Sequence, residues 1–524
     1  MKQGDRLGEG TFGIVYSATD LESDDQYAVK RNLIEKRIFG IGSLRETDVL
    51  QKLSGHPNIV QLEKISFKNP FGEECFSPLP IDDDRKSQRD DSVHFIFEKA
   101  KCDLHNFIKH WDKKGYSFYK KYMVDILLGL EYIHGKKIIH RDLKPSNILI
   151  SIDDNTAKIC DFGLAKPYTY QGIQSPGLVT AWYRAPEIVL DYPHYDYKSD
   201  VWSVGCIFYE MIRRKPLLDG CPDSNNSIIS RILGELPTEL STQKMRSLVT
   251  SNNWGTARRL YAYSSPKKRK PFLEKLGLTN SGRECFNKTA GDLNLFCDLL
   301  NHMFEFDWEE RYTTTQCLDH PFFNDYREFI METRTYYCPM VTEIPINTIT
   351  CVERKWVKEV VNSILLRKIS RWFSFRPLFQ AVELFDKYLI TMKNAHPPNE
   401  NEMESELKGL IHNKFDTILR FYVCFYMCVK YFSSLGYSFS FDEIVEKEYK
   451  TMEAKNIAEM FEAGFFVHGL KYDVYDTTIY EIADVYDNFL TNEQAENLLL
   501  ARINDNEICN MLPSQLYQKY MASS

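Results

Sequence analysis

Two runs in the first third of the chain place carboxylate, amide and ammonium side chains at short spacing. IIHRDLKPSNILI contains Asp142, Lys144 and Asn147, and KICDFGLAK contains Asp161. A carboxylate can accept the proton of a hydroxyl nucleophile, carboxylate and amide oxygens bind Mg²⁺, and an ammonium stabilises a phosphoryl group in transfer. We therefore predict Asp142 as the catalytic base and Lys144 as the residue that stabilises the phosphoryl group. Asn147 and Asp161 are the predicted Mg²⁺ ligands.

A glycine-rich run, LGEGTFGIVY, lies close to the start of the chain and has the pattern G-x-G-x-x-G-x-V. Glycines allow a strand turn to bring backbone amides close to a polyphosphate. Many nucleotide-binding folds space glycines in this way, so the run alone is weak support for an ATP site. The predicted phosphate loop comprises Leu7, Gly8, Glu9, Gly10, Thr11, Phe12, Gly13 and Val15.

A lysine and a glutamate complete the predicted phosphate site. YAVK places Lys30 on an apolar strand, where an ammonium is costly unless it has anionic partners. GSLRETDVL places Glu46 in a helical stretch about sixteen residues later. An ion pair between Lys30 and Glu46 would hold the lysine on the α- and β-phosphates. Either residue alone could belong to an ordinary surface salt bridge, but the combination favours a catalytic pair.

These runs follow one another in order, and APE comes after them. In this order they resemble the eukaryotic protein kinase superfamily over residues 1–323. The resemblance implies an α+β fold with a small strand-rich lobe over about residues 1–100 and a larger helical lobe over about 101–323. It also implies that ATP binds between the lobes with Mg²⁺ and that the γ-phosphate is transferred to protein side chains.

The resemblance gives roles to residues outside these runs. Glu187 of APE is expected to form an ion pair with Arg311, and Asp200 of DVWSVGC is expected to brace the catalytic loop. A pseudokinase, which binds without catalysis, would be expected to lack the lysine, the base or a Mg²⁺ ligand. The chain retains all of them, so the enzyme is favoured over the binding protein.

The same family pattern places the adenine site and indicates the acceptor side chain. Phe97 is the expected gatekeeper, and the backbone from Glu98 to Ala100 is the expected hinge that binds adenine. Lys144, two residues after the base, is typical of the serine/threonine form of the catalytic loop. We therefore expect a protein serine/threonine kinase.

VTAWYRAPEIVL resembles the segment shared by cyclin-dependent, mitogen-activated and related kinases, which prefer proline after the phosphoacceptor. Arg184 is expected to shape this pocket, so protein substrates with Ser/Thr-Pro sites are implied. GSLRE resembles the end of the regulatory helix of the cyclin-dependent branch, with Arg45 and Glu46 at matching positions. We therefore expect a cyclin-dependent-kinase-like enzyme.

Ser175 lies where this family carries the phosphorylated residue of its activation loop. A phosphate there would add nearly two negative charges, which Arg45 and Arg141 would bind. The third basic residue is Lys166, where arginine is usual, and lysine cannot bind a phosphate in bidentate fashion. Whether activity depends on Ser175 phosphorylation is therefore left open, and a plain polar loop residue is the alternative.

The chain after the kinase-like region is expected to be helical. Residues 324–351 contain Pro339 and Pro345 and no sustained periodicity, so we predict a linker there. A helix over 416–434 is predicted to be apolar on nearly every side, as in a bundle. In LFQAVELFDKYL, Gln380 is expected on the polar face. The opposite, apolar face comprises Leu378, Ala381, Val382, Phe385, Tyr388 and Leu389.

The order of these helices resembles a cyclin box over residues 352–490, followed by a tail over 491–524. Asp386 matches an internal carboxylate of the box, Lys430 matches the lysine that touches the kinase helix, and Glu462 is the least secure match. The resemblance implies a kinase activated by its own cyclin-like domain, in cis or in trans. The alternatives are an unrelated helical interaction domain, or a scaffold whose kinase fold only presents these helices.

Composition excludes several other classes of protein. The formal charge of −8 gives no reason to expect direct nucleic-acid binding, and the apolar run at 421–429 is too short to span a bilayer. Thirteen scattered cysteines and the absence of a signal peptide indicate an intracellular protein, in cytoplasm or nucleus. PKKRK at 266–270 is either a nuclear-import signal or a solvated basic loop. Cys160 borders the expected ATP site, where it is either accessible to electrophiles or simply packed.

Overall fold

The computed structural model describes two regions of the chain. The first covers most of residues 1–337, and the second covers parts of 357–385 together with 414–432 and 444–445. Within the first region the description leaves out residues 11–12, 34–40, 67–69, 71–91, 111–115, 152–154, 168–180, 191–194 and 236–289.

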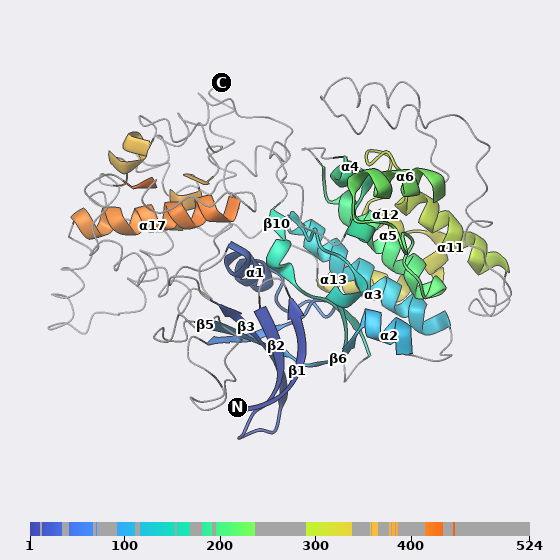
Figure 1. Ribbon diagram of the computed structural model, residues 1–524, viewed down its shortest axis with the longest axis horizontal. Coiled ribbons are helices and arrows are strands. Elements are labelled where there is room, and N and C mark those ends of the chain that lie inside the picture. The colour runs from blue at the N-terminus through green and yellow to red at the C-terminus, as the bar shows by residue number, and fades with distance from the viewer. Residues whose placement is uncertain are drawn as a thin grey trace.

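The small lobe is built on a five-stranded antiparallel sheet in the order β1-β2-β3-β5-β4 (Figure 1). Successive side chains of a strand point to opposite faces of the sheet, so Val29 and Lys30 of β3 face different sides. Val29 packs with Ala18 and Ile96 in a small cluster of its own, whereas Phe95 belongs to the main core. The elements of this lobe are β1 Lys2–Gly10, β2 Gly13–Thr19, β3 Gln26–Leu33, α1 Ile41–Lys52, β4 Leu62–Ser66 and β5 Ser92–Glu98.

The large lobe is helical and has a buried helix at its centre (Figure 1). Helix α5, with the sequence KSDVWSVGCIFYEMIR, is buried along almost its whole length because other elements surround it. Trp202 of α5 packs edge-on against Phe304, at 5.1 Å between ring centroids. The helices are α2 Leu104–His110, α3 Tyr116–Gly135, α4 Pro186–Val189, α5 Lys198–Arg213, α6 Asn225–Glu235, α11 Ala290–Met303 and α12 Thr314–Leu318.

Short strands and 3₁₀ turns hold the two catalytic runs against this helical core. One small sheet has the order β6-β8-β9, and β10 pairs with β7 in another. Isolated short strands are weak, so their position depends on the buried residues beneath them. They are β6 Ala100–Asp103, β7 Ile138–Ile139, β8 Ile148–Ser151, β9 Ala157–Ile159 and β10 Lys166–Pro167, with 3₁₀ turns η1 Pro145–Asn147, η2 Phe162–Leu164, η3 Ala181–Tyr183 and η4 Pro321–Tyr326.

The predicted linker is wrong over its first part, because helix α13 spans Arg327–Tyr336. Only Ile330 and Thr333 of this helix are buried, so apolar packing contributes little to holding it. Ion pairs hold it instead: Arg334 donates from Nε to Glu131 Oε2 at 2.7 Å and from Nη2 to Oε1 at 2.8 Å. The helical lobe therefore continues beyond residue 323 to about residue 337.

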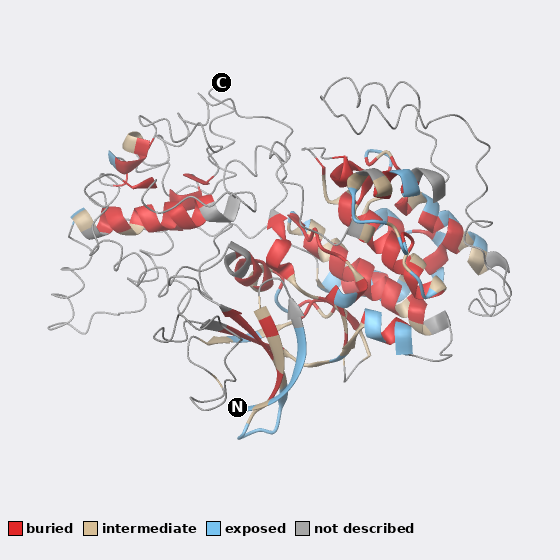
Figure 2. Ribbon diagram, in the orientation of Figure 1, coloured by how far each residue is buried: buried red, intermediate tan, exposed pale blue. Residues whose placement is uncertain are grey.

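The C-terminal region contains a long buried helix, α17 Lys414–Phe432, as the pattern over 416–434 predicts. From Phe421 to Val429 its side chains are buried on all sides, whereas Lys414 at its start is exposed (Figure 2). Phe421 of α17 packs edge-on against Phe385, at 5.6 Å between ring centroids. Among the helices of the described residues, none combines the length and hydrophobicity needed to cross a membrane.

The expected amphipathic face in LFQAVELFDKYL is only partly correct. Leu378, Ala381, Val382 and Phe385 are buried as predicted, but Gln380 is fully buried rather than exposed. Burial of Gln380 therefore depends on the elements packed around this segment and not on its own pattern. Of the cyclin-box candidates, Asp386 and Glu462 lie outside the described residues, and Lys430 lies in α17 without a described side chain.

Candidate active site

Lys30 lies at the meeting point of β3, α1 and the DFG run. Its Nζ donates to Glu46 Oε1 at 2.6 Å and Oε2 at 2.8 Å, and to Asp161 Oδ1 at 3.3 Å. Burial would lower the pKa of Lys30, but the carboxylates of Glu46 and Asp161 outweigh it and raise the pKa above its ordinary value. The ammonium therefore stays charged. The predicted pair is formed, and it is joined to the predicted Mg²⁺ ligand.

The catalytic loop is held by carboxylate and amide hydrogen bonds. Lys144 Nζ donates to Asp142 Oδ2 at 2.8 Å, and Asn147 Nδ2 donates to the same oxygen at 3.0 Å. Asn147 Nδ2 also donates to the Asp142 carbonyl oxygen at 2.7 Å. The second oxygen, Asp142 Oδ1, is buried and makes no hydrogen bond within the described part of the chain. Among the described residues, this oxygen is thus the one of the carboxylate that has no protein donor.

Asp200 braces the loop from α5, as the family pattern predicts. Its Oδ2 accepts from the His140 backbone N–H and its Oδ1 from the Arg141 N–H, both at 2.9 Å. Arg141 has a φ of 72°, a left-handed conformation that these bonds stabilise. His134 Nε2, which our sequence reading missed, lies 3.0 Å from Asp200 Oδ2. No local pattern indicates this contact, because it joins residues from different helices.

The predicted Mg²⁺ ligands fit a small, hard cation. Asn147 donates through Nδ2, so its amide oxygen would be the atom that binds a metal ion, and Asp161 would supply a carboxylate. Oxygen ligands of this kind suit Mg²⁺. Burial would raise the pKa of Asp161, but Lys30 and His140 outweigh it and lower the pKa below its ordinary value. Asp161 is thus ionised and partly accessible, with 33% of its side chain exposed.

The predicted phosphate loop is a β1–β2 hairpin. Gly10 pairs with Gly13 across it, and Thr11 and Phe12 between them lie outside the described residues. A Cβ on Gly13 would lie 2.1 Å from the Arg31 carbonyl oxygen, so this position requires glycine for packing against β3. A Cβ added to Gly8 would have no other atom within 4 Å, so packing does not require glycine at that position. The remaining loop positions, Leu7, Glu9 and Val15, lie on these two strands.

The predicted hinge is the short connection between the lobes. Strand β5 ends at Glu98 and β6 begins at Ala100. Phe97, the expected gatekeeper, is buried beside Phe95 with ring centroids 6.4 Å apart. Cys160 lies close to this site, but burial and then Asp161 raise the pKa of its thiol well above the ordinary value. A thiol held in its neutral form is a poor nucleophile, which favours packing over reactivity.

The basic residues of the predicted activation site are all buried. They are Arg45 on α1, Arg141 in the catalytic loop and Lys166 on β10. Lys166 pairs with Ile139 of β7, which leads directly into the catalytic loop. Arg141 also donates to the Tyr195 hydroxyl group. Ser175 lies outside the described residues, so its relation to these three side chains stays a prediction.

The expected ion pair below the APE run is formed. Arg311 Nη1 donates to Glu187 Oε1 at 2.7 Å and Nη2 to Oε2 at 2.9 Å, and both side chains are fully buried. The Arg311 guanidinium also lies over the Trp202 ring, 5.1 Å from its centroid. Arg184 lies just before this run and is partly buried. The predicted substrate-pocket residue therefore stands next to a rigid anchor.

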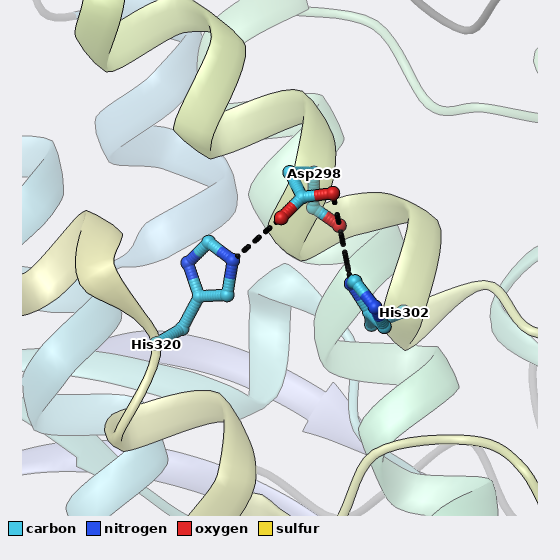
Figure 3. Close-up of side chains that lie close together, drawn as sticks. All are labelled: Asp298, His302 and His320. Carbon is cyan, nitrogen blue, oxygen red and sulfur yellow. Dashed lines mark hydrogen bonds and ion pairs between the residues drawn. The ribbon is translucent and has the colours of Figure 1, made fainter.

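A cluster of Asp298, His302 and His320 in the large lobe has the residue types of a metal site (Figure 3). The Phe322 N–H donates to His320 Nδ1 at 3.2 Å, so the ring proton is on Nε2, which lies 3.1 Å from Asp298 Oδ2. His302 Nδ1 lies 2.9 Å from the Asp298 carbonyl oxygen and must carry a proton to bond it. Both nitrogens that face Asp298 therefore carry protons. The cluster is a hydrogen-bonded network that caps a turn, not a ligand set.

Comparisons with known proteins agree with this geometry. The family model described as "Protein kinase domain" matches residues 1–323. Mitogen-activated protein kinase 2 of Arabidopsis thaliana is 33% identical over 321 residues, which are 60% of this chain and 75% of the relative. Mitogen-activated protein kinase 3 of Oryza sativa subsp. japonica is 32% identical over 320 residues, 60% and 76% of the two chains. Mitogen-activated protein kinase 14 of Arabidopsis thaliana is 29% identical over 372 residues, 70% and 90%.

These relatives change the narrower assignment. They are mitogen-activated protein kinases, so they do not support the cyclin-dependent branch that GSLRE suggests. The family match also ends at residue 323, so the cyclin-like domain stays a prediction. The chain belongs to the protein kinase family and is an ATP-dependent protein serine/threonine kinase related to the mitogen-activated protein kinases.

Proposed function

We propose that this kinase transfers the γ-phosphate of Mg-ATP to serine or threonine residues that precede proline in protein substrates. The observation that carries the proposal is the asymmetry of the Asp142 carboxylate. Its Oδ2 is held by Lys144 and Asn147, while its buried Oδ1 makes no hydrogen bond within the described residues. A carboxylate fixed at one oxygen presents the other to a substrate hydroxyl in a defined direction.

The chain's own residues divide the work of phosphoryl transfer. Mg²⁺, when bound with ATP, neutralises charge on the phosphates. Asn147 and Asp161 would hold the ion through oxygen atoms, and Lys30 would bind the phosphates while Glu46 keeps its ammonium in place. Asp142 accepts the hydroxyl proton, and Lys144 stabilises charge on the phosphoryl oxygens. Every one of these groups already has its protein partner, so little reorganisation is needed.

Selectivity for proline rests on Arg184 and on the kinship with mitogen-activated protein kinases. Arg184 stands between the activation segment and the APE run, whose position is fixed by the Glu187–Arg311 ion pair. A proline after the phosphoacceptor brings no backbone N–H into the pocket, so no acceptor has to be supplied for it. Any other residue would bury a donor there, which costs binding energy if it is unpaired.

The test is phosphate transfer from Mg-ATP to matched Ser-Pro and Ser-Ala peptides by the full chain. We expect transfer to the Ser-Pro peptide, and a loss of about 10²- to 10⁴-fold in kcat for Asp142→Asn. Asp223→Asn, at an exposed position, is the matched control and should leave kcat unchanged. Equal rates on both peptides would contradict proline direction. No transfer by the wild-type chain would contradict the proposal and favour the scaffold.

A finer part of the proposal is that the C-terminal helices act as the kinase's own activator. Six consecutive residues of α1, 45–50, are all buried. A helix that packs one face on a sheet normally exposes the other, so α1 must be covered on both sides. Helix α17 contacts α1, and buried apolar residues of the two helices belong to one continuous hydrophobic core.

A charged part of α1 lies within electrostatic range of α17. Burial raises the pKa of the Cys428 thiol well above its ordinary value, and Cys424 and then Asp48 raise it further. Cys428 of α17 is therefore within electrostatic range of Asp48, which itself pairs with Lys52 at 3.0 Å. Because α1 also carries Glu46, a helix docked on its outer face would favour the ion-paired position. Because both helices belong to one chain, their effective concentration is high, and a weak interface is sufficient for α17 to dock on α1.

Point substitutions in the full chain test this activator role. Cys428→Glu would place a second carboxylate near Asp48 and weaken docking, whereas Cys428→Ser changes the volume little and should retain it. We expect Cys428→Glu to increase hydrogen exchange in residues 45–52 and to lower kcat/KM about tenfold. Adding Asp48→Asn should restore part of the activity. Faster exchange in these residues with unchanged kcat/KM would contradict the activator role of the C-terminal helices and leave the proposed kinase activity standing.

A further inference from the structure

The carboxylate of Glu98 joins three segments that are far apart in the sequence. Its Oε1 accepts from the Gln61 backbone N–H at 2.8 Å, and its Oε2 accepts from Lys158 Nζ at 2.7 Å. Glu98 ends β5, Gln61 begins the approach to β4, and Lys158 lies in the middle of β9. The side chain is therefore a junction at the entrance to the hinge.

The Gln61 arm of this junction leads back to α1. Gln61 Oε1 accepts from the Gly55 N–H at 2.8 Å, and Nε2 donates to the carbonyl oxygens of Ile59 at 2.7 Å and His56 at 3.1 Å. Both ends of the amide are thus bound within the loop that follows α1. The Glu98 backbone N–H also donates to the Gln61 carbonyl oxygen at 3.3 Å, so the two residues are joined by two hydrogen bonds.

The Lys158 arm leads forward to the predicted Mg²⁺ ligand. Strand β9 continues through Ile159 towards Asp161. The Ile159 N–H donates to the Asn58 carbonyl oxygen at 2.9 Å, and the Val60 N–H donates to the Ile159 carbonyl oxygen at 3.0 Å. The loop after α1 and strand β9 are therefore already paired, and Glu98 adds the hinge to that pair.

We propose that the Glu98 carboxylate is a positioning group that fixes the hinge backbone relative to Asp161 and so sets nucleotide affinity and base selectivity. The proposal rests on the proposed nucleotide site, in which the hinge backbone binds adenine while Lys30 and Asp161 handle the phosphates and Mg²⁺. Both ends of ATP are then bound by segments whose separation this junction controls. Glu98 touches no reacting atom with its side chain, so its effect is on binding rather than on the chemical step.

Geometry rather than charge supplies the effect. The Glu98 side chain is 29% exposed and that of Lys158 is 13% exposed, and a partly exposed ion pair contributes little stability by itself. The carboxylate, however, also supplies the acceptor for the Gln61 N–H. Without it the hinge can turn relative to the phosphate site, which misaligns adenine with the backbone groups that distinguish it from guanine.

Four variants of the full chain separate these contributions. Glu98→Ala removes both contacts, whereas Glu98→Gln retains an acceptor for the Gln61 N–H. Lys158→Met removes only the ion pair, and Lys64→Met makes the same change at an exposed position of neighbouring β4. We expect Glu98→Ala to raise KM for ATP roughly tenfold. Glu98→Gln and Lys158→Met should raise it less, and Lys64→Met should match wild type.

The pattern of the kinetics decides the inference. We expect kcat to stay within about twofold of wild type, and the ratio of KM for GTP to KM for ATP to fall in Glu98→Ala. The double variant Glu98→Gln/Lys158→Met should be no worse than the stronger single variant, because both remove one ion pair. A fall in kcat at unchanged KM, an unchanged nucleotide ratio, or an equal effect of Lys64→Met would overturn the proposal.

Nucleotide binding provides a readout that does not depend on the substrate. We expect the affinity for Mg-ADP to fall roughly tenfold in Glu98→Ala, as measured by titration calorimetry. If the wild-type chain binds Mg-ADP but transfers no phosphate to the Ser-Pro peptide, the proposed function fails while this titration still tests Glu98. Equal Mg-ADP affinity of wild type and Glu98→Ala would overturn the positioning role alone.

Discussion

Lys30 Nζ lies 2.6 Å from Glu46 Oε1 and 3.3 Å from Asp161 Oδ1, so one ammonium joins helix α1 to the predicted Mg²⁺ site. The three groups come from β3, from α1 and from the turn after β9. The position of α1 therefore determines where the lysine points. Any change that moves this helix also acts on the phosphate site.

The first prediction concerns this ion pair. Glu46→Gln removes the negative charge but keeps the shape, so Lys30 should turn towards Asp161 and leave the phosphates. We expect kcat/KM to fall about ten- to a hundredfold, since small misplacements of a positioning group have effects of this size. Glu63→Gln, at an exposed position of β4, is the control. Steady-state kinetics with an unchanged kcat/KM for Glu46→Gln would show that the pair is not needed.

The second prediction contrasts a buried ion pair with an exposed one. Glu187→Gln leaves the fully buried Arg311 guanidinium without its charged partner, which typically costs about 3–5 kcal/mol. Arg327→Met breaks the ion pair with Asp319, in which the two side chains are 38% and 48% exposed. This change should lower the free energy of unfolding by at most about 1 kcal/mol. Urea unfolding curves of the full-length variants measure both. Similar midpoints for the two would contradict the assigned difference.

The third prediction follows from helix α13. Arg334→Met removes the bidentate contact with Glu131 and the contact with Asp319 at 2.8 Å. We expect faster hydrogen exchange in residues 327–336 and an unchanged kcat, because the helix carries none of the predicted catalytic side chains. Glu332→Gln, exposed on the same helix, is the control. Fast exchange of this segment in the wild-type chain would instead support the predicted linker over these residues.

The fourth prediction is a pH dependence of stability. Burial lowers the pKa of His56 to about 4, whereas an unfolded histidine titrates near 6.5. Between these values the unfolded chain binds more protons than the folded one, so the stability present above pH 6.5 is lost as the pH falls towards 4. The largest loss from this group is about 3 kcal/mol.

Glutamine at position 56 tests that dependence. His56→Gln retains an acceptor for the Asn58 N–H, which donates to His56 Nδ1 at 3.2 Å, but cannot titrate. We expect its free energy of unfolding to vary less between pH 7 and pH 4.5 than that of wild type. His110→Gln, at an exposed position, should retain the wild-type slope. Parallel slopes for wild type and His56→Gln would exclude His56 as the cause.

Much of the catalytic site follows from the sequence alone. Asp142 and Asn147 lie within a few residues of each other on one turn, so their chemistry is set by local spacing. Asp161, Lys30 and Glu46 are more distant, but each stands in a short run with its own pattern. The pair between Glu187 and Arg311 also followed from the family pattern, although 124 residues separate the two. Residue type and order were sufficient in all these cases, because each residue stands in a short run that the family pattern defines.

Only the tertiary structure decided the contacts that have no local pattern. The Glu98–Lys158 pair and the role of His134 join elements whose sequences say nothing about each other. Helix α13 is held by ion pairs to residues far away in the sequence, and Gln380 is fully buried although its position in the sequence predicts a face that meets water. Periodicity reports the affinity of a side chain for water or for a core, whereas burial depends on which elements pack around it. The cyclin-box resemblance implies that a C-terminal helix touches the kinase helix, but the burial of α1 over residues 45–50 depends on that packing and could not be read from its own sequence.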